Sequence, residues 1–530
     1  MKKRMAALAL ALAIAAGAGG CARDKGEELP PEESPAPTEE LNIEEPRPEP
    51  IVSILSRESK LALAYYPTLP LNPYTCDNVY NRNIGGLIYE SLVSVDADYE
   101  VKAMLCSSWH SDDNVNWTFT LREGVTFSDG TPLTAEDVVY SLQTAQTMGA
   151  YTSRFARVAS IVAVSEREVA VTLTKPNVYF ARLMDVPIIP QGAAGDMLPL
   201  GTGPYKFALG SGTYYLEENT FRWQGGDLPV ERVELKITEN QEQTLYDFQT
   251  GDVTLVSYDK TATGTVVYRD NCEKFQTGTT TMQYLGFNTD NFFTGETVVR
   301  QALMAAIDRE YIAGEIFEGF AVASALPVSP YCADYDEELA DSVKYYSGAL
   351  AQKLHDAGFR DTDLDGILER YRTKFTLDFI VNNENPYKVQ AARLIAEQMR
   401  AAGIEVTLRE LTWEEFKAAL KARSYDVYYG EIRLQKDFDL TSLLYSYASN
   451  NYGAYSNATA DAMLISYLDG SATPSQLYEF LLESAPIAPI LFKEQQVLAH
   501  RGLVKQIQST GWNVFNDFKQ WRFSAASNDK

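Results

Sequence analysis

The chain has 530 residues, more than a single core usually holds, so its length predicts two or three domains. The formal net charge of −26 would repel the phosphates of a nucleic acid, which argues against nucleic acid as a partner. The sequence has three widely separated histidines and no HExxH, CxxC, GxSxG or P-loop pattern. The usual parts of zinc and nucleophile chemistry are missing, so we predict a protein that is not an enzyme, without catalytic residues, cofactor or metal site.

The N-terminal region indicates export followed by a tether. Residues 1–20 have a basic start, an apolar run too short for a good membrane span, and small residues at the end, as a signal peptide does. The small residues before Cys21 resemble a bacterial lipobox, so we expect Cys21 to be acylated; plain export is the alternative. Residues 21–50 are rich in Pro and Glu and predict a disordered spacer. The protein would then be lipid-anchored on the extracytoplasmic face of the cell membrane, at the cell surface or in the periplasm.

Four further cysteines leave the disulfide question open. In an exported protein they can pair in three ways, and buried free thiols are equally compatible with the sequence. These residues are Cys76, Cys106, Cys272 and Cys332.

The folded part begins with a strand and a helix. Residues 61–66 (LALAYY) predict a buried strand, and the apolar spacing of residues 83–95 predicts a helix.

Residues 117–141 predict a compact folding unit. Trp117, Phe119 and Leu121 alternate with threonines, which is typical of a half-buried strand. A Ser-Asp-Gly-Thr turn follows. Thr134 stands three residues before Asp137, as in a capping box, and predicts the start of a helix. This unit is expected to be scaffold rather than part of a binding site.

The sequence of this unit, WTFTLREGVTFSDGTPLTAEDVVYS, resembles the signature of family 5 of the extracytoplasmic solute-binding proteins of ABC transporters, which bind oligopeptides, dipeptides or nickel. The GTGPY element at residues 201–205 and the VRQA…DR segment at residues 299–309 are similar to further family motifs. The resemblance implies an α/β, two-lobed periplasmic-binding-protein-like fold of type II, with an extra subdomain and two hinge crossings.

The resemblance also implies a division of the chain into parts. Residues 73–188 would form the extra subdomain of lobe I, and residues 283–490 would form lobe II. Lobe I itself would combine three segments, which are residues 51–72, 189–282 and 491–530.

Lobe II is expected to follow a βαβ rhythm. Strands are predicted at residues 375–381 and 404–406, with an amphipathic helix at 387–402 between them. By resemblance, the hinge crossings would lie near Met282 and in residues 485–492.

Residues 361–366 (DTDLDG) have Asp at positions 1, 3 and 5 and Gly at position 6, which is the pattern of the first half of an EF-hand calcium loop. The twelfth position, which needs a bidentate Glu, is Arg372. We therefore expect a surface turn there.

The loop after Tyr429 is the main candidate for ligand binding, because ligands gather at the carboxyl ends of strands in α/β lobes. In peptide-binding members of the family, an Asp in the matching loop captures the α-ammonium group, and Asp437 aligns best with it. The gap before Asp437 is longer here, and the family's Trp and Pro are absent. Glu431 and Arg433 could hold the two ends of a zwitterion, or could pair with each other.

Four residues complete the predicted ligand contacts. Tyr429 ends a strand, Asn450 follows in a polar stretch, and Tyr66 would face them from lobe I. Trp413 is either an aromatic wall or part of the helix packing.

The resulting hypothesis is a monomeric solute-binding lipoprotein of an ABC importer. It would capture short peptides by hinge closure and deliver them to permease subunits. The alternatives are another solute (a nickel complex, an opine or a sugar), a peptide sensor and, least favoured, a lipid-anchored hydrolase.

Overall fold

The computed structural model describes residues 61–262, 268 and 272–524. The predicted signal peptide, Cys21 and the predicted tether lie outside the described residues. Within the described ranges, no helix is long and apolar enough to cross a membrane.

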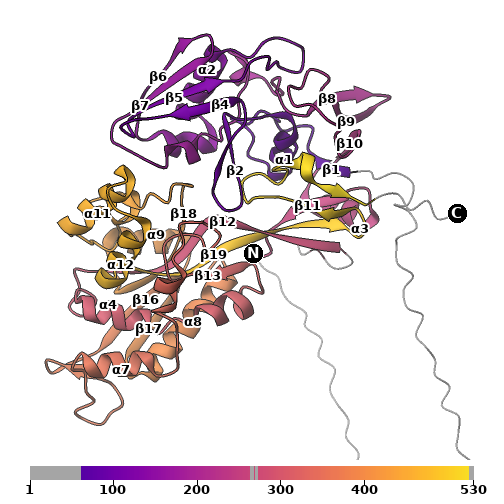
Figure 1. Ribbon diagram of the computed structural model, residues 1–530. Coiled ribbons are helices and arrows are strands. Elements are labelled where there is room, and N and C mark those ends of the chain that lie inside the picture. Colours follow the sequence, from indigo (N-terminus) through magenta and orange to yellow (C-terminus); the bar gives the residue numbers. More distant parts are fainter. Residues whose placement is uncertain (1–60, 263–267, 269–271, 525–530) are drawn as a thin grey trace, which may run out of the picture. The chain divides into compact units, whose positions relative to one another are not determined.

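Two long antiparallel strands run through the centre of the molecule (Figure 1). β12 (Cys272–Phe287) pairs with β19 (Ile487–His500) from Cys272 opposite His500 to Gly286 opposite Ile487. The pairing shifts register between Gly278 and Met282. The crossings expected near Met282 and in residues 485–492 fall in these two strands, and their role as hinges stays a prediction.

The strands belong to a seven-stranded mixed sheet with the order β11-β19-β12-β18-β16-β17, in which β13 pairs with β19. β16 pairs in parallel with both β17 and β18, whereas β12 and β18 are antiparallel. The other strands are β11 (Leu255–Tyr258), β13 (Ala321–Ala323), β16 (Thr376–Asn382), β17 (Glu405–Leu411) and β18 (Val427–Arg433).

Helices flank the part of this sheet that belongs to lobe II (Figure 1). One core joins the sheet to α4 and α8, and another joins it to α9, α11 and α12. The expected strand–helix–strand unit is confirmed, with α8 between β16 and β17. The helices of lobe II are α4 (Thr297–Met304), α7 (Ala349–Asp356), α8 (Pro386–Ala401), α9 (Trp413–Ala422), α11 (Ala458–Asp469) and α12 (Pro474–Ser484), among others.

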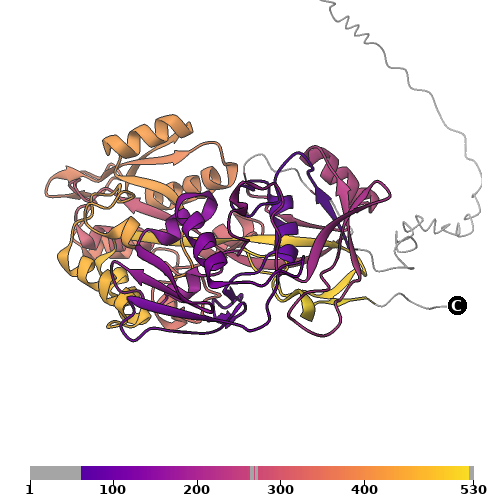
Figure 2. The ribbon, with the colours of Figure 1, turned by 90° about the horizontal axis from the view of Figure 1, so that it is seen from above.

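Lobe I contains a four-stranded sheet at the opposite end from the helices of lobe II, as the view from above shows (Figure 2). Its order is β1-β10-β9-β8, and β1 and β10 are parallel. The strands are β1 (Leu61–Tyr65), β8 (Tyr205–Gly210), β9 (Thr213–Glu218) and β10 (Arg232–Ile237). The helices α1 (Val79–Ile88) and α3 (Gln241–Thr250) lie nearby in the chain.

The helix expected at residues 83–95 is corrected by the structure. α1 ends at Ile88, because Tyr89 adopts an extended conformation as its C-cap. The β-branched pair in β2 (Val93–Val95) then joins β3 (Val101–Ala103).

The unit at residues 117–141 forms as predicted. β5 (Asn116–Leu121) buries Trp117, Phe119 and Leu121 and belongs to a sheet of order β4-β5-β7-β6. α2 (Ala135–Thr147) begins with a complete capping box between Thr134 and Asp137. The remaining strands of this sheet are β4 (Cys106–His110), β6 (Val158–Ser165) and β7 (Glu168–Leu173).

Within the described residues, Cys76, Cys106 and Cys332 are free thiols. Burial raises the pKa of Cys106 to about 11 and that of Cys332 to about 12, so both stay protonated at neutral pH.

Candidate functional site

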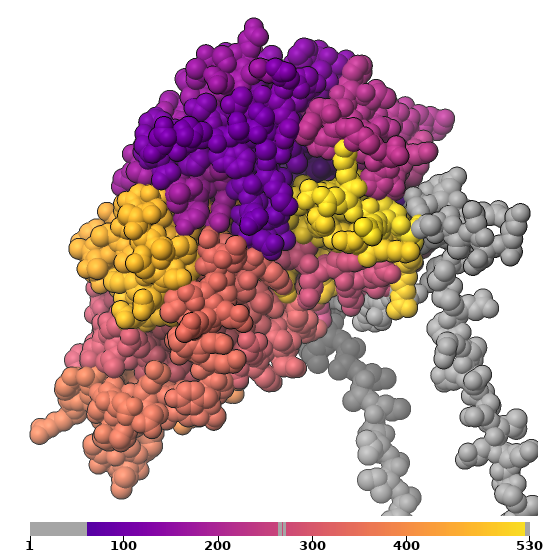
Figure 3. Space-filling view, in the orientation of Figure 1, coloured from indigo at the N-terminus to yellow at the C-terminus, as the bar shows by residue number. Residues whose placement is uncertain are grey.

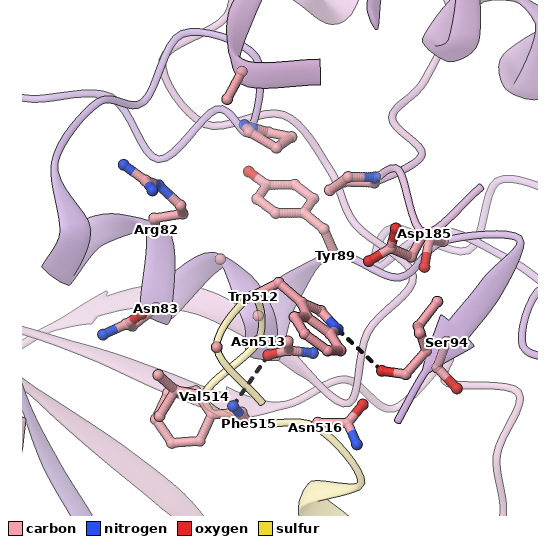
Figure 4. A pocket seen from close by; sticks show the side chains of 18 of the residues that line it. Arg82, Asn83, Tyr89, Ser94, Asp185, Trp512, Asn513, Val514, Phe515 and Asn516 are labelled. Atoms are coloured by element: carbon pink, nitrogen blue, oxygen red, sulfur yellow. Dashed lines mark hydrogen bonds between the residues drawn. The ribbon is translucent and has the colours of Figure 1, made fainter. Parts of the chain in front are cut away.

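A cavity of about 740 Å³ opens between the two lobes. α1 contributes Arg82 and Asn83, and the C-terminal segment contributes Trp512 and Asn513. Lobe II contributes Arg433 from the end of β18. Figure 4 shows the α1 and C-terminal side chains around the cavity, with the Trp512 indole donating to the Val95 carbonyl at 3.0 Å.

The side chain of Arg433 lacks a charged or hydrogen-bonding partner within the part of the chain that the structure describes. Its pKa is lowered first by burial, and then by the nearby positive charges of Arg154 and Arg82. Arg154 pairs with Asp185 at 2.6 Å, and Arg82 donates to the Asp77 carbonyl at 3.0 Å. Among the described residues, Arg433 thus brings a positive charge to the cavity wall with neither a carboxylate nor a hydrogen-bond acceptor beside it, and an anionic group of a ligand would complete it.

Two other charged side chains at the cavity have polar partners within the protein. Lys493 pairs with Asp259 at 2.7 Å. Glu90 accepts from the Trp223 indole at 2.9 Å and from Thr202 at 3.0 Å, and burial raises its pKa to about 7. Because Thr202 belongs to the GTGPY element, this buried carboxyl group holds a family motif in place.

The loop that follows β18 contacts the subdomain of the other lobe. Asp437 accepts from the Asn177 amide at 2.9 Å, and Asp439 pairs with Arg157 at 2.9 Å. Lys436 forms a buried ion pair with Asp185. Figure 3 shows the helices after this loop (orange-yellow) against the subdomain (purple).

Burial shifts the pKa values of two charges in this loop. The pKa of Asp437 is raised to about 6, first by burial and then by Asp439. The pKa of Lys436 is lowered to about 7 by burial, which Asp185 partly opposes. The contact between the loop and the subdomain thus includes two charged groups, on Lys436 and Asp437, that are buried away from water.

The sequence comparison assigns this two-lobed protein to a family. A sequence model of the bacterial extracellular solute-binding proteins, family 5 (middle region), matches residues 100–454. The chain belongs to this family. The oligopeptide-binding protein AppA of Bacillus subtilis is 25% identical over 425 residues, which cover 75% of this chain and 78% of AppA.

Solved family 5 structures confirm the two-lobed α/β fold. The structure of B. subtilis AppA with a nonapeptide aligns with a TM-score of 0.57 and 22% identity, covering 88% of this chain and 99% of AppA. A nickel ABC transporter protein from Bacillus halodurans aligns with a TM-score of 0.71 and 19% identity, covering 86% of this chain and 98% of that one.

Of the seven ligand contacts predicted from the sequence, the structure places Arg433 in the lining of the cavity. Glu431 does not pair with Arg433: it accepts from Gln283 at 2.7 Å and pairs with Lys388 at 3.2 Å. Asp437 is buried against Asn177.

The other four predicted residues make contacts elsewhere. Tyr429 donates to Gln283 at 2.7 Å, and the Tyr66 hydroxyl lies 2.9 Å from that of Thr244. Trp413 begins α9 and stacks on Phe416. The backbone N–H of Asn450 donates to the Ser442 carbonyl at 3.1 Å. Their roles towards a ligand stay predictions.

The lobe I wall of the cavity was missed from the sequence. Arg82 and Asn83 lie on α1, where two polar residues next to the buried Ile84 were an available signal. The C-terminal segment was expected to belong to lobe I, and Phe518 packs there against Tyr205 with ring centroids 5.9 Å apart. Trp512 instead lines the cavity, where the ammonium of Lys436 lies 4.5 Å from its ring centroid.

Proposed function

We propose that this family 5 protein is the solute-binding lipoprotein of an ABC importer and that it captures short peptides between its lobes. The single observation that carries the proposal is the inter-lobe cavity with the uncompensated guanidinium of Arg433 in its wall. The relative AppA of B. subtilis is an oligopeptide-binding protein, which supports the same class of ligand.

The proposed role of Arg433 is to bind the terminal carboxylate of the peptide. A guanidinium presents parallel N–H donors that fit a carboxylate in a bidentate way. Arg82 and Arg154 add positive potential at the same wall. The cavity volume of about 740 Å³ lies within the roughly 300–1,000 Å³ range of small-ligand pockets.

The proposed mechanism is a shift of population towards the closed state. A ligand that touches both α1 and Arg433 gains its full contacts only when the lobes are together, so it favours that state by this difference. The register shift in β12 between Gly278 and Met282 is the proposed point of bending.

Glu431 is a proposed second contact for longer ligands. Residues two apart in a strand share one face, so Glu431 and Arg433 project to the same side of β18. Removal of the Glu431 charge is expected to weaken binding less than removal of the Arg433 charge. The Glu431 carboxylate already pairs with Lys388 and accepts a hydrogen bond from Gln283.

The proposal also includes lipid anchoring through Cys21 and docking of the closed monomer on permease subunits. Mass spectrometry of protein extracted from membranes tests the anchor: a diacylglycerol on Cys21 supports it, and an unmodified mature N-terminus contradicts it.

The test of the ligand class is a thermal-shift and calorimetric screen of the purified protein. Free di- to pentapeptides should raise the melting temperature, and the same peptides with amidated C-termini should bind more weakly. A nickel–histidine complex, an opine or a sugar that raises the melting temperature where peptides do not would replace the peptide proposal with that solute.

A further inference from the structure

The loop after α7, in the lower part of Figure 1, gathers acidic side chains that ligand capture does not use. Asp361, Asp363 and Asp365 precede Gly366, whose N–H donates to the Asp361 carboxylate at 3.0 Å. The loop is closed by an antiparallel bridge in which Arg360 and Glu369 exchange backbone hydrogen bonds of 3.0 and 2.7 Å.

This bridge brings a fourth carboxylate to the three aspartates. One oxygen from each of Asp361, Asp363, Asp365 and Glu369 can be chosen so that all lie within 4.8 Å of one another. Glu369 is held from behind, since the N–H and hydroxyl of Thr362 donate to its Oε2 at 2.7 and 2.8 Å. The backbone pairing therefore places Glu369 beside the loop that carries the three aspartates.

Two oxygens of the cluster are buried without a hydrogen bond within the described part of the chain. Glu369 is only 8% exposed, and its Oε1 has no donor; the same holds for Oδ1 of Asp361. A buried acceptor without a donor is destabilising, and more strongly so when it is charged. Both oxygens belong to carboxylates of the cluster, so a cation that binds these two oxygens would remove the penalty.

We propose that Asp361, Asp363, Asp365 and Glu369 form a Ca²⁺ site on lobe II. The donors are all carboxylate oxygens, the ligand type that hard cations prefer. Ca²⁺ accepts six to eight oxygens in a flexible geometry, whereas Mg²⁺ demands a near-ideal octahedron and keeps its waters. This proposal would replace the sequence expectation of a plain surface turn, with Glu369 at the ninth loop position supplying the carboxylate that Arg372 at the twelfth cannot.

Lys374 occupies part of the site when the metal is absent. Its ammonium lies 3.3 Å from Asp363 Oδ2 and also contacts Asp365. The side chain is 43% exposed on a flexible stem, so it is free to swing into solvent when a divalent ion enters. One ammonium neutralises one of four carboxylates, which leaves the site negative enough to attract Ca²⁺.

The experiment is calorimetric titration of CaCl₂ into the chelator-treated mature protein, together with melting temperatures in Ca²⁺ and in Mg²⁺. Extracellular modules of this kind bind Ca²⁺ at roughly 0.1–1 mM. We expect binding in that range, a higher melting temperature in Ca²⁺ than in Mg²⁺, and a loss of at least about tenfold in affinity for Asp363→Asn. Lys374→Met should bind Ca²⁺ more tightly than the wild type.

Asp112→Asn removes a carboxylate that is 91% exposed and lies outside the cluster, and it should leave Ca²⁺ binding unchanged. Asp363 is exposed, so its variant is expected to fold, and Lys374→Met tests the site without removing a ligand. No Ca²⁺ binding by either the wild type or Lys374→Met would overturn the proposal. Equal losses in Asp112→Asn and Asp363→Asn would also overturn it, because they would mean diffuse attraction to an acidic protein.

Discussion

The sheet that contains β5 and the loop that follows β18 are stabilised in opposite ways. Trp117, Phe119 and Leu121 bury apolar side chains against neighbours in the same subdomain. The loop buries Lys436 and Asp437 against charged or polar partners more than 200 residues away in the chain. The first region needs only a matching apolar pattern, whereas the second needs individual partners, and this makes it sensitive to pH and to lobe position.

The largest expected effect is on the apolar core around β5. Phe119→Ala removes a fully buried ring and should lower the free energy of unfolding by about 3–5 kcal/mol, because the β-sheet core cannot fully collapse around the space. Urea unfolding measures the change. Thr118→Ala, at a half-buried position on the opposite face, is the control and should cost much less.

Peptide affinity of folded Phe119→Ala, measured well below its melting temperature, should equal that of the wild type. A loss of affinity without a loss of stability would mean that this subdomain takes part in binding and is more than scaffold.

The next effect concerns the charged cavity wall. Arg433→Gln should weaken peptide binding by about 1.5–3 kcal/mol, the range for a hydrogen bond to a charged group, and should leave the ligand-free stability nearly unchanged. Calorimetry with one peptide and its C-terminal amide measures the change. The amide should lose little further affinity in the variant, since the group that distinguishes the two ligands is gone.

Arg423→Gln removes an exposed arginine that pairs with Asp290 at 3.3 Å and serves as the matched control. If Arg433→Gln and Arg423→Gln bind the peptide equally well, the carboxylate role of Arg433 is wrong.

A third prediction concerns the pH dependence of the lobe contact at Asp437. Its pKa is about 6 where the lobes touch, against a usual value of 3.8, so the contacting state binds the proton more tightly. Contact is therefore favoured as pH falls from about 6 to 4 and is weakened as pH rises through 6. Small-angle scattering of the ligand-free protein should show a smaller radius of gyration at pH 5 than at pH 7.

Asp437→Asn should abolish this trend. Lys436 acts in a different window, because its pKa of about 7 lies below the usual 10.5 and favours contact only as pH rises above 7. A radius of gyration that grows as pH falls from 7 to 5 would contradict the assignment to Asp437.

The sequence predicted the fold well where local pattern decides it. The alternation in β5, the capping box of α2 and the unit formed by β16, α8 and β17 all follow from short-range periodicity and caps. The helix expected through residue 95 was wrong because pairing of β2 with β3 overrode the helical spacing.

The candidate site was less predictable because its charges find partners far away in the chain. Nothing near Glu431 in the sequence indicates Lys388, and nothing near Asp437 indicates Asn177. Arg433 was identified because it ends a strand at the edge where ligands gather, but its lack of a partner became visible only in three dimensions. Likewise, Glu369 joins Asp361 through a backbone bridge that the loop pattern alone does not reveal.

The smallest expected effect returns to the locally determined region. Thr134→Ala removes the hydroxyl that accepts from the Asp137 N–H at 3.3 Å, and an N-cap of this kind contributes about 1 kcal/mol. Asp137 keeps a second bond, from the Gln191 N–H at 2.8 Å, so the start of α2 stays attached to the subdomain and the loss should not exceed this value. Urea unfolding of Thr134→Ala and Thr134→Ser measures it, with Ser expected to retain most of the stability. A loss as large as that of Phe119→Ala would show that this helix end carries long-range interactions of the kind found in the loop after β18, and the contrast between the two regions would then be one of degree.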